Sequence, residues 1–116
     1  MHYQGSCHCG AVAFEVEADL SGGVVSCNCS ICTAKGALLC AVPRDALSVT
    51  APEEGLGTYS FNTHAIAHRF CKTCGIHPFA EDLNATGTPM AYINIRCLDG
   101  IDLASVPVME FDGRSM

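Results

Sequence analysis

The chain has little positive charge and no long hydrophobic run, and both absences limit what it can bind. Lys and Arg total 6 against 12 Asp and Glu among 116 residues, a formal charge of −6 at pH 7. Nucleic acids and anionic membranes attract clustered positive charge, so we expect neither as a partner. The longest apolar run, residues 37–43, is far shorter than the roughly 20 residues of a membrane-spanning helix.

Nine cysteines raise the question of compartment. The first six residues, Met-His-Tyr-Gln-Gly-Ser, show neither the basic nor the apolar region of a secretory signal. In a reducing interior, thiols bind metals or take part in catalysis, whereas exported chains use them for disulfides. The odd cysteine count without a signal therefore predicts a cytoplasmic protein whose cysteines serve metals or catalysis.

No repeat, low-complexity stretch or linker divides the sequence, so we expect a single domain over residues 1–116. Short apolar runs alternate with turn signals and no long 3.6-residue period occurs, which predicts a mostly β fold. The clearest strand pattern is the alternation of Val12, Phe14 and Val16 with small or acidic residues. Further strands are predicted at 24–29, 37–42, 47–50, 58–61, 65–70 and 90–95. Short helical turns are predicted at 30–36, from residue 43 and at 102–105.

Seven cysteines fall into three closely spaced groups: Cys7-His8-Cys9, Cys27-Asn28-Cys29-Ser30-Ile31-Cys32 and Cys71-Lys72-Thr73-Cys74-Gly75. In an extended chain, residues i and i+2 point to the same face, so two thiolates can converge on one zinc ion. In the last group a tight turn brings both sulfurs to the ion, and Gly75 is expected to take a positive φ there. Three such groups in one short chain indicate metal binding.

The count of seven suggests two kinds of zinc site. A closed structural site has four protein ligands, whereas a site with three leaves a position for water or substrate. The preferred division assigns the closed site to Cys7, Cys9, Cys71 and Cys74 and the open site to Cys27, Cys29 and Cys32. Spacing alone also allows other pairings, for example Cys27 and Cys29 with Cys71 and Cys74.

The two remaining cysteines, Cys40 and Cys97, lie in or beside apolar segments and are expected to be small buried side chains. Several zinc chemistries are excluded because their motifs are absent: the nucleobase deaminase signature, His-Glu-x-x-His and the two-Cys, two-His finger. The segment Ile76-His77-Pro78 blocks the helix that a thioredoxin-like site would need after Cys74.

The histidines near the cysteine groups are expected to play supporting roles. His8 and His77 would hydrogen-bond sulfur or shape the turns. His64 and His68 are four residues apart, but the surrounding strand-like pattern places them on one strand face, where we do not expect a metal pair.

The ordered motifs resemble a known family. Gly5-Ser6-Cys7-His8-Cys9-Gly10, the second cysteine group and Phe70-Cys71-Lys72-Thr73-Cys74-Gly75 are similar to the glutathione-dependent formaldehyde-activating enzymes, which share their domain with centromere protein V. Residues 94–99 and 111–114 resemble the ending of short bacterial members. The resemblance implies a β-tent fold of several small coiled antiparallel sheets with short helical turns. It also implies two zinc ions, a structural one on Cys7, Cys9, Cys71 and Cys74 and a catalytic one on Cys27, Cys29 and Cys32.

The family's named reaction joins formaldehyde and glutathione to S-(hydroxymethyl)glutathione and is classed as a carbon–sulfur lyase. The resemblance therefore implies a zinc-dependent lyase-like enzyme acting on a small thiol such as glutathione and formaldehyde or a related aldehyde. Lys35, Arg69 and Arg96 are candidates by position to attract an anionic thiol. Two alternatives remain: a non-enzymatic zinc module that binds a thiol metabolite or a protein partner, and a thiol redox sensor that releases zinc from the three-cysteine group.

Overall fold

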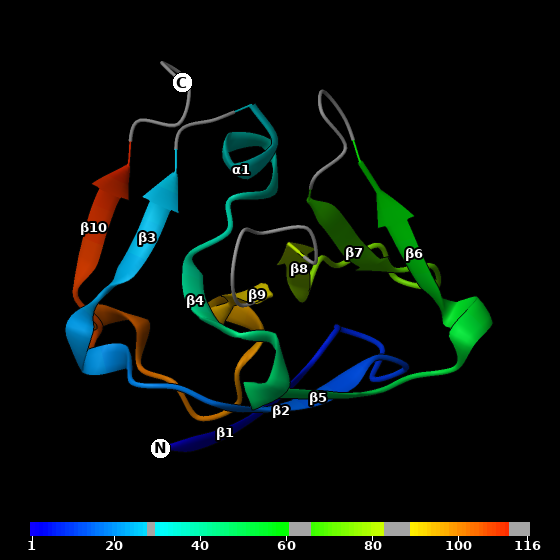
Figure 1. The fold of residues 1–116 in the computed structure, drawn as a ribbon, viewed down its shortest axis with the longest axis horizontal. Helices are drawn as coiled ribbons and strands as arrows, with labels where there is room; N and C mark the ends of the chain where they lie inside the picture. Colours follow the sequence, from blue (N-terminus) through cyan, green and yellow to red (C-terminus); the bar gives the residue numbers. More distant parts are fainter. Residues whose placement is uncertain (28–29, 61–65, 83–88, 112–116) are drawn as a thin grey trace.

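The computed structural model describes residues 1–27, 30–60, 66–82 and 89–111, which form two β-sheets. The smaller sheet contains β1 (His2–Ser6), β2 (Ala13–Glu17) and β5 (Leu47–Thr50) in the order β1-β2-β5, all antiparallel. In β2, Phe14 and Val16 are buried while Glu15 and Glu17 are exposed, so the predicted alternation is confirmed. This sheet lies across the bottom of the view in Figure 1.

The larger sheet has seven strands in the order β10-β3-β4-β9-β8-β7-β6. Their bounds are Val108–Phe111, Val24–Cys27, Leu39–Pro43, Met90–Asn94, Phe79–Asp82, Ala67–Cys71 and Leu56–Tyr59, respectively. Every neighbouring pair is antiparallel except β10 and β3, which run parallel. The mostly β prediction, with small antiparallel sheets and short helical turns, is confirmed.

One α-helix, α1 (Ser30–Lys35), follows β3 and lies between the β3–β10 arm and the β6–β7 arm in Figure 1. It ends at Lys35 and is followed by Gly36, whose φ of +66° is readily adopted by glycine because it has no Cβ. Short 3-10 turns occur at Leu20–Gly22, Arg44–Ala46, Glu53–Gly55, Ile95–Cys97 and Leu103–Ser105. Within the described ranges, no helix is long and apolar enough to cross a membrane.

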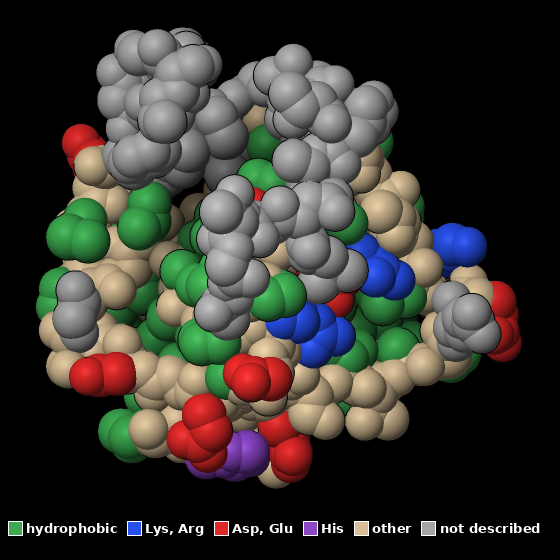
Figure 2. Space-filling view, in the orientation of Figure 1, with side chains coloured by type: hydrophobic (Ala, Val, Ile, Leu, Met, Phe, Trp, Pro, Cys, Tyr) green, Lys and Arg blue, Asp and Glu red, His purple; other side chains and the backbone are tan. Residues whose placement is uncertain are grey.

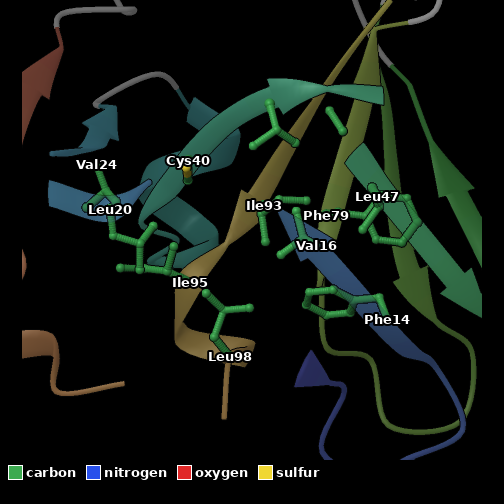
Figure 3. Close-up of a cluster of buried hydrophobic side chains, with 12 residues drawn as sticks. Phe14, Val16, Leu20, Val24, Cys40, Leu47, Phe79, Ile93, Ile95 and Leu98 are labelled. Carbon is green, nitrogen blue, oxygen red and sulfur yellow. The ribbon is translucent and has the colours of Figure 1, made fainter. Parts of the chain in front are cut away.

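The main hydrophobic core lies between the two sheets and draws side chains from both (Figure 3). Phe14 and Val16 come from the small sheet, and Phe79 and Ile93 come from adjacent strands of the large one. Because Phe79 faces this core, its neighbours Ala80 and Asp82 on β8 face the opposite side of the large sheet. The large sheet therefore has a core face and an outer face, and α1 lies beside the outer face.

On the core face of the large sheet, the buried carboxylate of Glu81 connects several strands through two arginines. Glu81 is 5% exposed, and its two oxygens accept hydrogen bonds from Arg44 Nε at 2.7 Å and Arg69 Nη1 at 3.0 Å. Arg44 also donates to the carbonyl of Leu47 at 2.7 Å, and Arg69 donates to that of Gly57 at 3.3 Å. These contacts join β8 to β7 and β6 on one side and to the start of β5 on the other.

Three strands do not follow from the sequence pattern: β1, β8 and β10. β1 carries the polar sequence HYQGS and is held by its ladder with β2 and by side-chain contacts such as His2 Nδ1 with Glu17 Oε1 at 2.8 Å. In β8 three of four residues are buried, so the apolar and polar alternation of a half-buried strand is missing. Figure 2 shows several acidic side chains along the lower edge of the molecule and basic side chains both near its middle and at its right edge.

Candidate metal centre and the polar cluster beside the helix

Two turns, one after β1 and one after β7, bring four cysteine sulfur atoms together: those of Cys7, Cys9, Cys71 and Cys74. All four Sγ atoms lie within 4.8 Å of one another. Cys9 Sγ is 3.6 Å from Cys7 Sγ and 3.6 Å from Cys71 Sγ. Tetrahedral zinc with bonds of about 2.3 Å places its sulfurs about 3.8 Å apart, so the cluster has the spacing of a closed zinc site.

Glycines shape both turns. Gly10 N–H donates to Cys7 O at 3.2 Å, and Gly75 N–H donates to Cys71 O at 2.8 Å. Their φ angles are +83° and +82°, a region where a Cβ would be strained. The positive φ predicted for Gly75 is confirmed, and the first turn uses the same device.

Backbone N–H groups favour ionised sulfur in the second turn. The pKa of Cys74 is lowered to about 6, chiefly because the N–H of Ile76, and then that of Cys9, donates to its sulfur. The pKa of Cys71 is also lowered because the N–H groups of Cys74 and Thr73, 3.5 and 3.4 Å away, outweigh the effect of burial. Thiolate is the form that binds metal, so the turn is prepared for an ion.

Cys9 shows the opposite shift. The N–H of Ala11 lowers its pKa, but the hydrogen bond with Cys71, burial and the sulfurs of Cys7 and Cys74 together raise it to about 11. Thiols this close cannot all ionise together unless a cation shares their charge. The donor set, the spacing and the prepared thiolates therefore fit a divalent ion such as zinc.

The four-cysteine cluster also links the two sheets. Cys7 is 2% exposed and Cys71 is fully buried, and both pack against Val12 in a small hydrophobic cluster separate from the main core. Cys9 and Cys71 are 62 positions apart in the sequence. An ion here would close a long loop between the N-terminal strand and β7, a contribution to stability that a small core needs.

The second cysteine group is only partly within the described residues. Cys27 is the last residue of β3 and Cys32 lies within α1, so the backbone carries them on adjacent elements. Cys29 lies outside the described residues, as do the side chains of Cys27 and Cys32. The open three-cysteine site therefore stays a prediction.

Beside α1, a lysine and a histidine from distant parts of the sequence are in contact. Lys35, the last residue of α1, places Nζ 3.3 Å from Nδ1 of His68 on β7. His68 is 6% exposed, and its pKa is lowered to about 4 by burial and by the nearby charges of Lys35 and His77. The imidazole is therefore neutral at pH 7. His64, its predicted companion, lies outside the described residues.

His77, in the segment between Cys74 and β8, belongs to the same neighbourhood. Burial and the charge of Lys35 lower its pKa. Its ring lies against Phe70, with centroids 5.5 Å apart, and its carbonyl accepts a hydrogen bond from Asn94 Nδ2 at 3.1 Å. Its Nδ1 is buried and has no hydrogen-bond partner among the described residues. Asn94 is a supporting residue that the sequence pattern does not reveal.

The other two predicted anion-attracting residues have different partners. Arg69 lies on the core face and pairs with Glu81, so it does not join Lys35 on the outer face. Its position on β7, next to the outward-facing His68, decides this because neighbouring residues of a strand point to opposite faces. Arg96 is exposed, and its Nε donates to Gly36 O at 3.0 Å, just beyond the end of α1.

Cys40 and Cys97 stand apart from these groups. Cys40 is 7% exposed in the main core, and burial raises its pKa, so its prediction as a small buried side chain is confirmed. Cys97 is half-buried against the same core, and burial, followed by the charges of Cys7 and Cys74, raises its pKa to about 11. Both thiols remain protonated at neutral pH and are poor nucleophiles.

The fold and site define a small, mostly β protein with a four-thiol centre suited to a metal ion. Comparison with known proteins is more specific. The family model described as glutathione-dependent formaldehyde-activating enzyme matches residues 2–111, and the chain belongs to that family. The family resemblance inferred from the cysteine motifs is thus confirmed.

The chain is also similar to two individual proteins. A protein of Phaeosphaeria nodorum, provisionally named a glutathione-dependent formaldehyde-activating enzyme, is 40% identical over 93 residues, 72% of this chain and 47% of the relative. The chain thus spans about half the length of this curated relative. A crystal structure of a Rhodobacter sphaeroides protein superposes with a TM-score of 0.78 at 32% identity, covering 91% of this chain and 99% of the other.

Proposed function

We propose that the protein condenses a small thiol such as glutathione with formaldehyde, or a related aldehyde, in a zinc-dependent carbon–sulfur lyase-like reaction. The open site would be held by Cys27, Cys29 and Cys32, and a structural zinc by Cys7, Cys9, Cys71 and Cys74. The observation that carries the proposal is the gathering of the latter four sulfurs within 4.8 Å. Since a closed site needs only four ligands, Cys27, Cys29 and Cys32 remain for a site with a vacant position.

The reaction forms one S–C bond, converts the aldehyde C=O to a C–O single bond and moves the thiol proton to that oxygen. When bound, zinc lowers the pKa of a thiol ligand and polarises an aldehyde oxygen. The chain supplies the framework: the four-cysteine centre fixes the end of β1 against β7, and the adjacent elements β3 and α1 carry Cys27 and Cys32. Such preorganisation holds thiol and aldehyde in reacting geometry.

The overall charge of the protein opposes an anionic substrate. Seven thiolates and two divalent zinc ions together add about −3 to the formal charge of −6. Glutathione is itself an anion at neutral pH, so it would need positive charge close to the open site. Lys35, at the end of the helix that carries Cys32, supplies such a charge.

The test compares the rate of adduct formation by wild type and Cys32→Ser. Exchange NMR measures this rate as the interconversion of formaldehyde and its glutathione adduct. This method separates the catalysed rate from the spontaneous one. We expect wild type to accelerate exchange, and Cys32→Ser to lower the rate at least tenfold while far-UV circular dichroism stays unchanged. Metal analysis should give two zinc ions per wild-type chain and one per Cys32→Ser chain.

The matched control is Cys40→Ala, which removes a thiol from the main core rather than from a predicted ligand group. It should keep both zinc ions and the wild-type rate. Wild-type exchange equal to the protein-free background with every thiol and aldehyde tested would contradict the enzymatic proposal.

A second candidate is a non-enzymatic zinc module that binds a thiol metabolite or a protein partner. It is favoured by the donor set of the predicted open site, because three thiolate ligands donate strongly to zinc and reduce its strength as a Lewis acid. Calorimetric binding of glutathione without any acceleration of exchange would support this candidate, and efficient turnover would eliminate it.

A further inference from the structure

The outer face of the large sheet carries a cluster of three nitrogen-bearing side chains from three separate segments: Lys35, His68 and His77. Lys35 Nζ lies 3.3 Å from His68 Nδ1 and interacts electrostatically with His77. His68 stands on β7 opposite Ala80, which has no side chain beyond Cβ. The cluster thus lies on the face beside α1, away from the hydrophobic core.

The protonation states follow from burial. Both imidazoles have lowered pKa values and are neutral at pH 7, so the single positive charge of the cluster resides on Lys35. Neutral His68 accepts the Lys35 hydrogen bond at Nδ1, and its proton is therefore on Nε2. This contact fixes the position of a flexible ammonium group with a side chain that carries no charge of its own.

The third member is firmly held. Phe70 packs against the His77 ring, and Asn94 donates to the His77 carbonyl while accepting from Arg96 N–H at 3.2 Å. The buried Nδ1 of His77 has no hydrogen-bond partner among the described residues. Such a nitrogen is normally satisfied by a ligand or water, so this part of the cluster is suited to a further polar group.

The remaining described cations lie elsewhere. Arg44 and Arg69 bind Glu81 on the core face, and Lys72 is exposed on the turn of the four-cysteine centre. Arg96 donates to Gly36 O at the end of α1. Among the described cations, Lys35 therefore lies both on the outer face and on the helix that carries Cys32.

We propose that Lys35 binds a carboxylate of the thiol substrate, that His68 positions its ammonium group, and that His77 forms the polar wall beside it. The site would then select acidic thiols such as glutathione over neutral thiols of similar reactivity. This inference rests on the proposed function, because it assigns the substrate class to that same open site.

The experiment compares two simple thiols that differ in one carboxylate, 3-mercaptopropionate and 2-mercaptoethanol, each with formaldehyde. For Lys35→Gln, KM for 3-mercaptopropionate should rise about 10- to 100-fold, the range expected for one lost hydrogen bond to a charged group. Its kcat, and both constants for 2-mercaptoethanol, should change less than twofold. Lys35→Arg should keep most of the selectivity because it retains the charge.

Positioning by His68 is tested with two variants. His68→Leu removes the acceptor and should raise KM for the carboxylated thiol, whereas His68→Asn keeps an acceptor near the Nδ1 position and should restore much of the affinity. Lys72→Gln, at the other lysine of the sequence, removes the same charge at an exposed site. It should leave the ratio of the two KM values unchanged while zinc content confirms an intact centre.

Binding measured by calorimetry separates this inference from the proposed reaction. Glutathione and its diethyl ester are titrated into wild type, Lys35→Gln and Lys72→Gln. Weakening by Lys35→Gln that is equal for both ligands, or matched by Lys72→Gln, would overturn the carboxylate site even if turnover is efficient. Charge-selective weakening in a protein without turnover would overturn the reaction but support the carboxylate site. If neither glutathione nor its diethyl ester binds to wild type, both the proposed reaction and the carboxylate site are overturned.

Discussion

Glu81 offers a sharp test of which cations serve the fold and which serve the substrate. Glu81 is 5% exposed, and its carboxylate bridges Arg44 at 2.7 Å and Arg69 at 3.0 Å. We expect Glu81→Gln to destabilise the protein, because the amide keeps the size of the side chain and one acceptor but loses the charge and the second acceptor. KM for carboxylated thiols should stay unchanged, since both arginines lie on the core face.

The magnitude follows from the geometry. Removing one member of a buried ion pair costs about 3–5 kcal/mol, because the remaining charge is left unpaired. Here the arginine side chains are 32% and 24% exposed, so water recovers part of that cost. Since glutamine also keeps one acceptor, we expect a loss of about 2 kcal/mol in the free energy of unfolding. With a urea m-value of about 1–3 kcal/mol/M, the midpoint should fall by roughly 1 M.

The assay is urea unfolding followed by far-UV circular dichroism at a fixed zinc concentration. The matched control is Glu15→Gln, the same chemical change at an exposed strand position whose carboxylate contacts Gln4 and His2. This control should stay within about 0.5 kcal/mol of wild type. The reasoning is refuted if Glu81→Gln is as stable as Glu15→Gln, or if it raises KM for carboxylated thiols as Lys35→Gln is expected to do.

Three further predictions concern the metal centre, the packing beside it and pH. Metal removal by a chelator, or Cys71→Ser, should abolish cooperative thermal unfolding at the wild-type temperature, because an ion held by Cys9 and Cys71 would join segments 62 positions apart; an unchanged calorimetric transition would exclude a structural ion. Gly57→Ala should lower the melting temperature by several degrees, since its Cβ would lie 2.3 Å from the Phe70 ring; Gly55→Ala is the control, because its φ is not positive either and its Cβ would meet no atom closer than 3.6 Å. The pKa of His68 is lowered from 6.5 to about 4, so the unfolded chain binds the additional proton between these values and stability should fall as pH drops through that window. In urea titrations from pH 7 to 4.5, His68→Asn should show a shallower decline than wild type, and equal slopes would contradict a neutral His68.

Periodicity located the strands whose two faces differ. β5 coincides with the predicted strand at 47–50, and β2 and β9 lie within one residue of their predicted bounds. The sequence pattern did not predict β8, because a central strand that is buried at most positions shows no alternation of apolar and polar residues. The sequence pattern did not predict β10 either, because this strand pairs with β3, whose residues lie 84 positions earlier in the sequence.

The candidate sites were also predicted only in part from the sequence. Ligand number made Cys7, Cys9, Cys71 and Cys74 the preferred group among several pairings that spacing allowed, and the structure brings these four sulfurs together. That they bind zinc, and that Cys27, Cys29 and Cys32 form an open site, stay predictions. The position of Arg69 could not be read from its place beside His68, because the face that each presents depends on the register of β7 with β8.

The sequence by itself determined the class of fold and the residues able to hold an ion, because strand alternation and ligand spacing are local properties of the chain. Only the tertiary structure decided that Lys35 contacts His68, which is 33 positions away in the sequence. It also decided that Arg44 and Arg69 donate hydrogen bonds to Glu81 on the core face. These contacts depend on strand order and register, which are set by burial of the whole sheet against its neighbour. Local spacing carries no information on either.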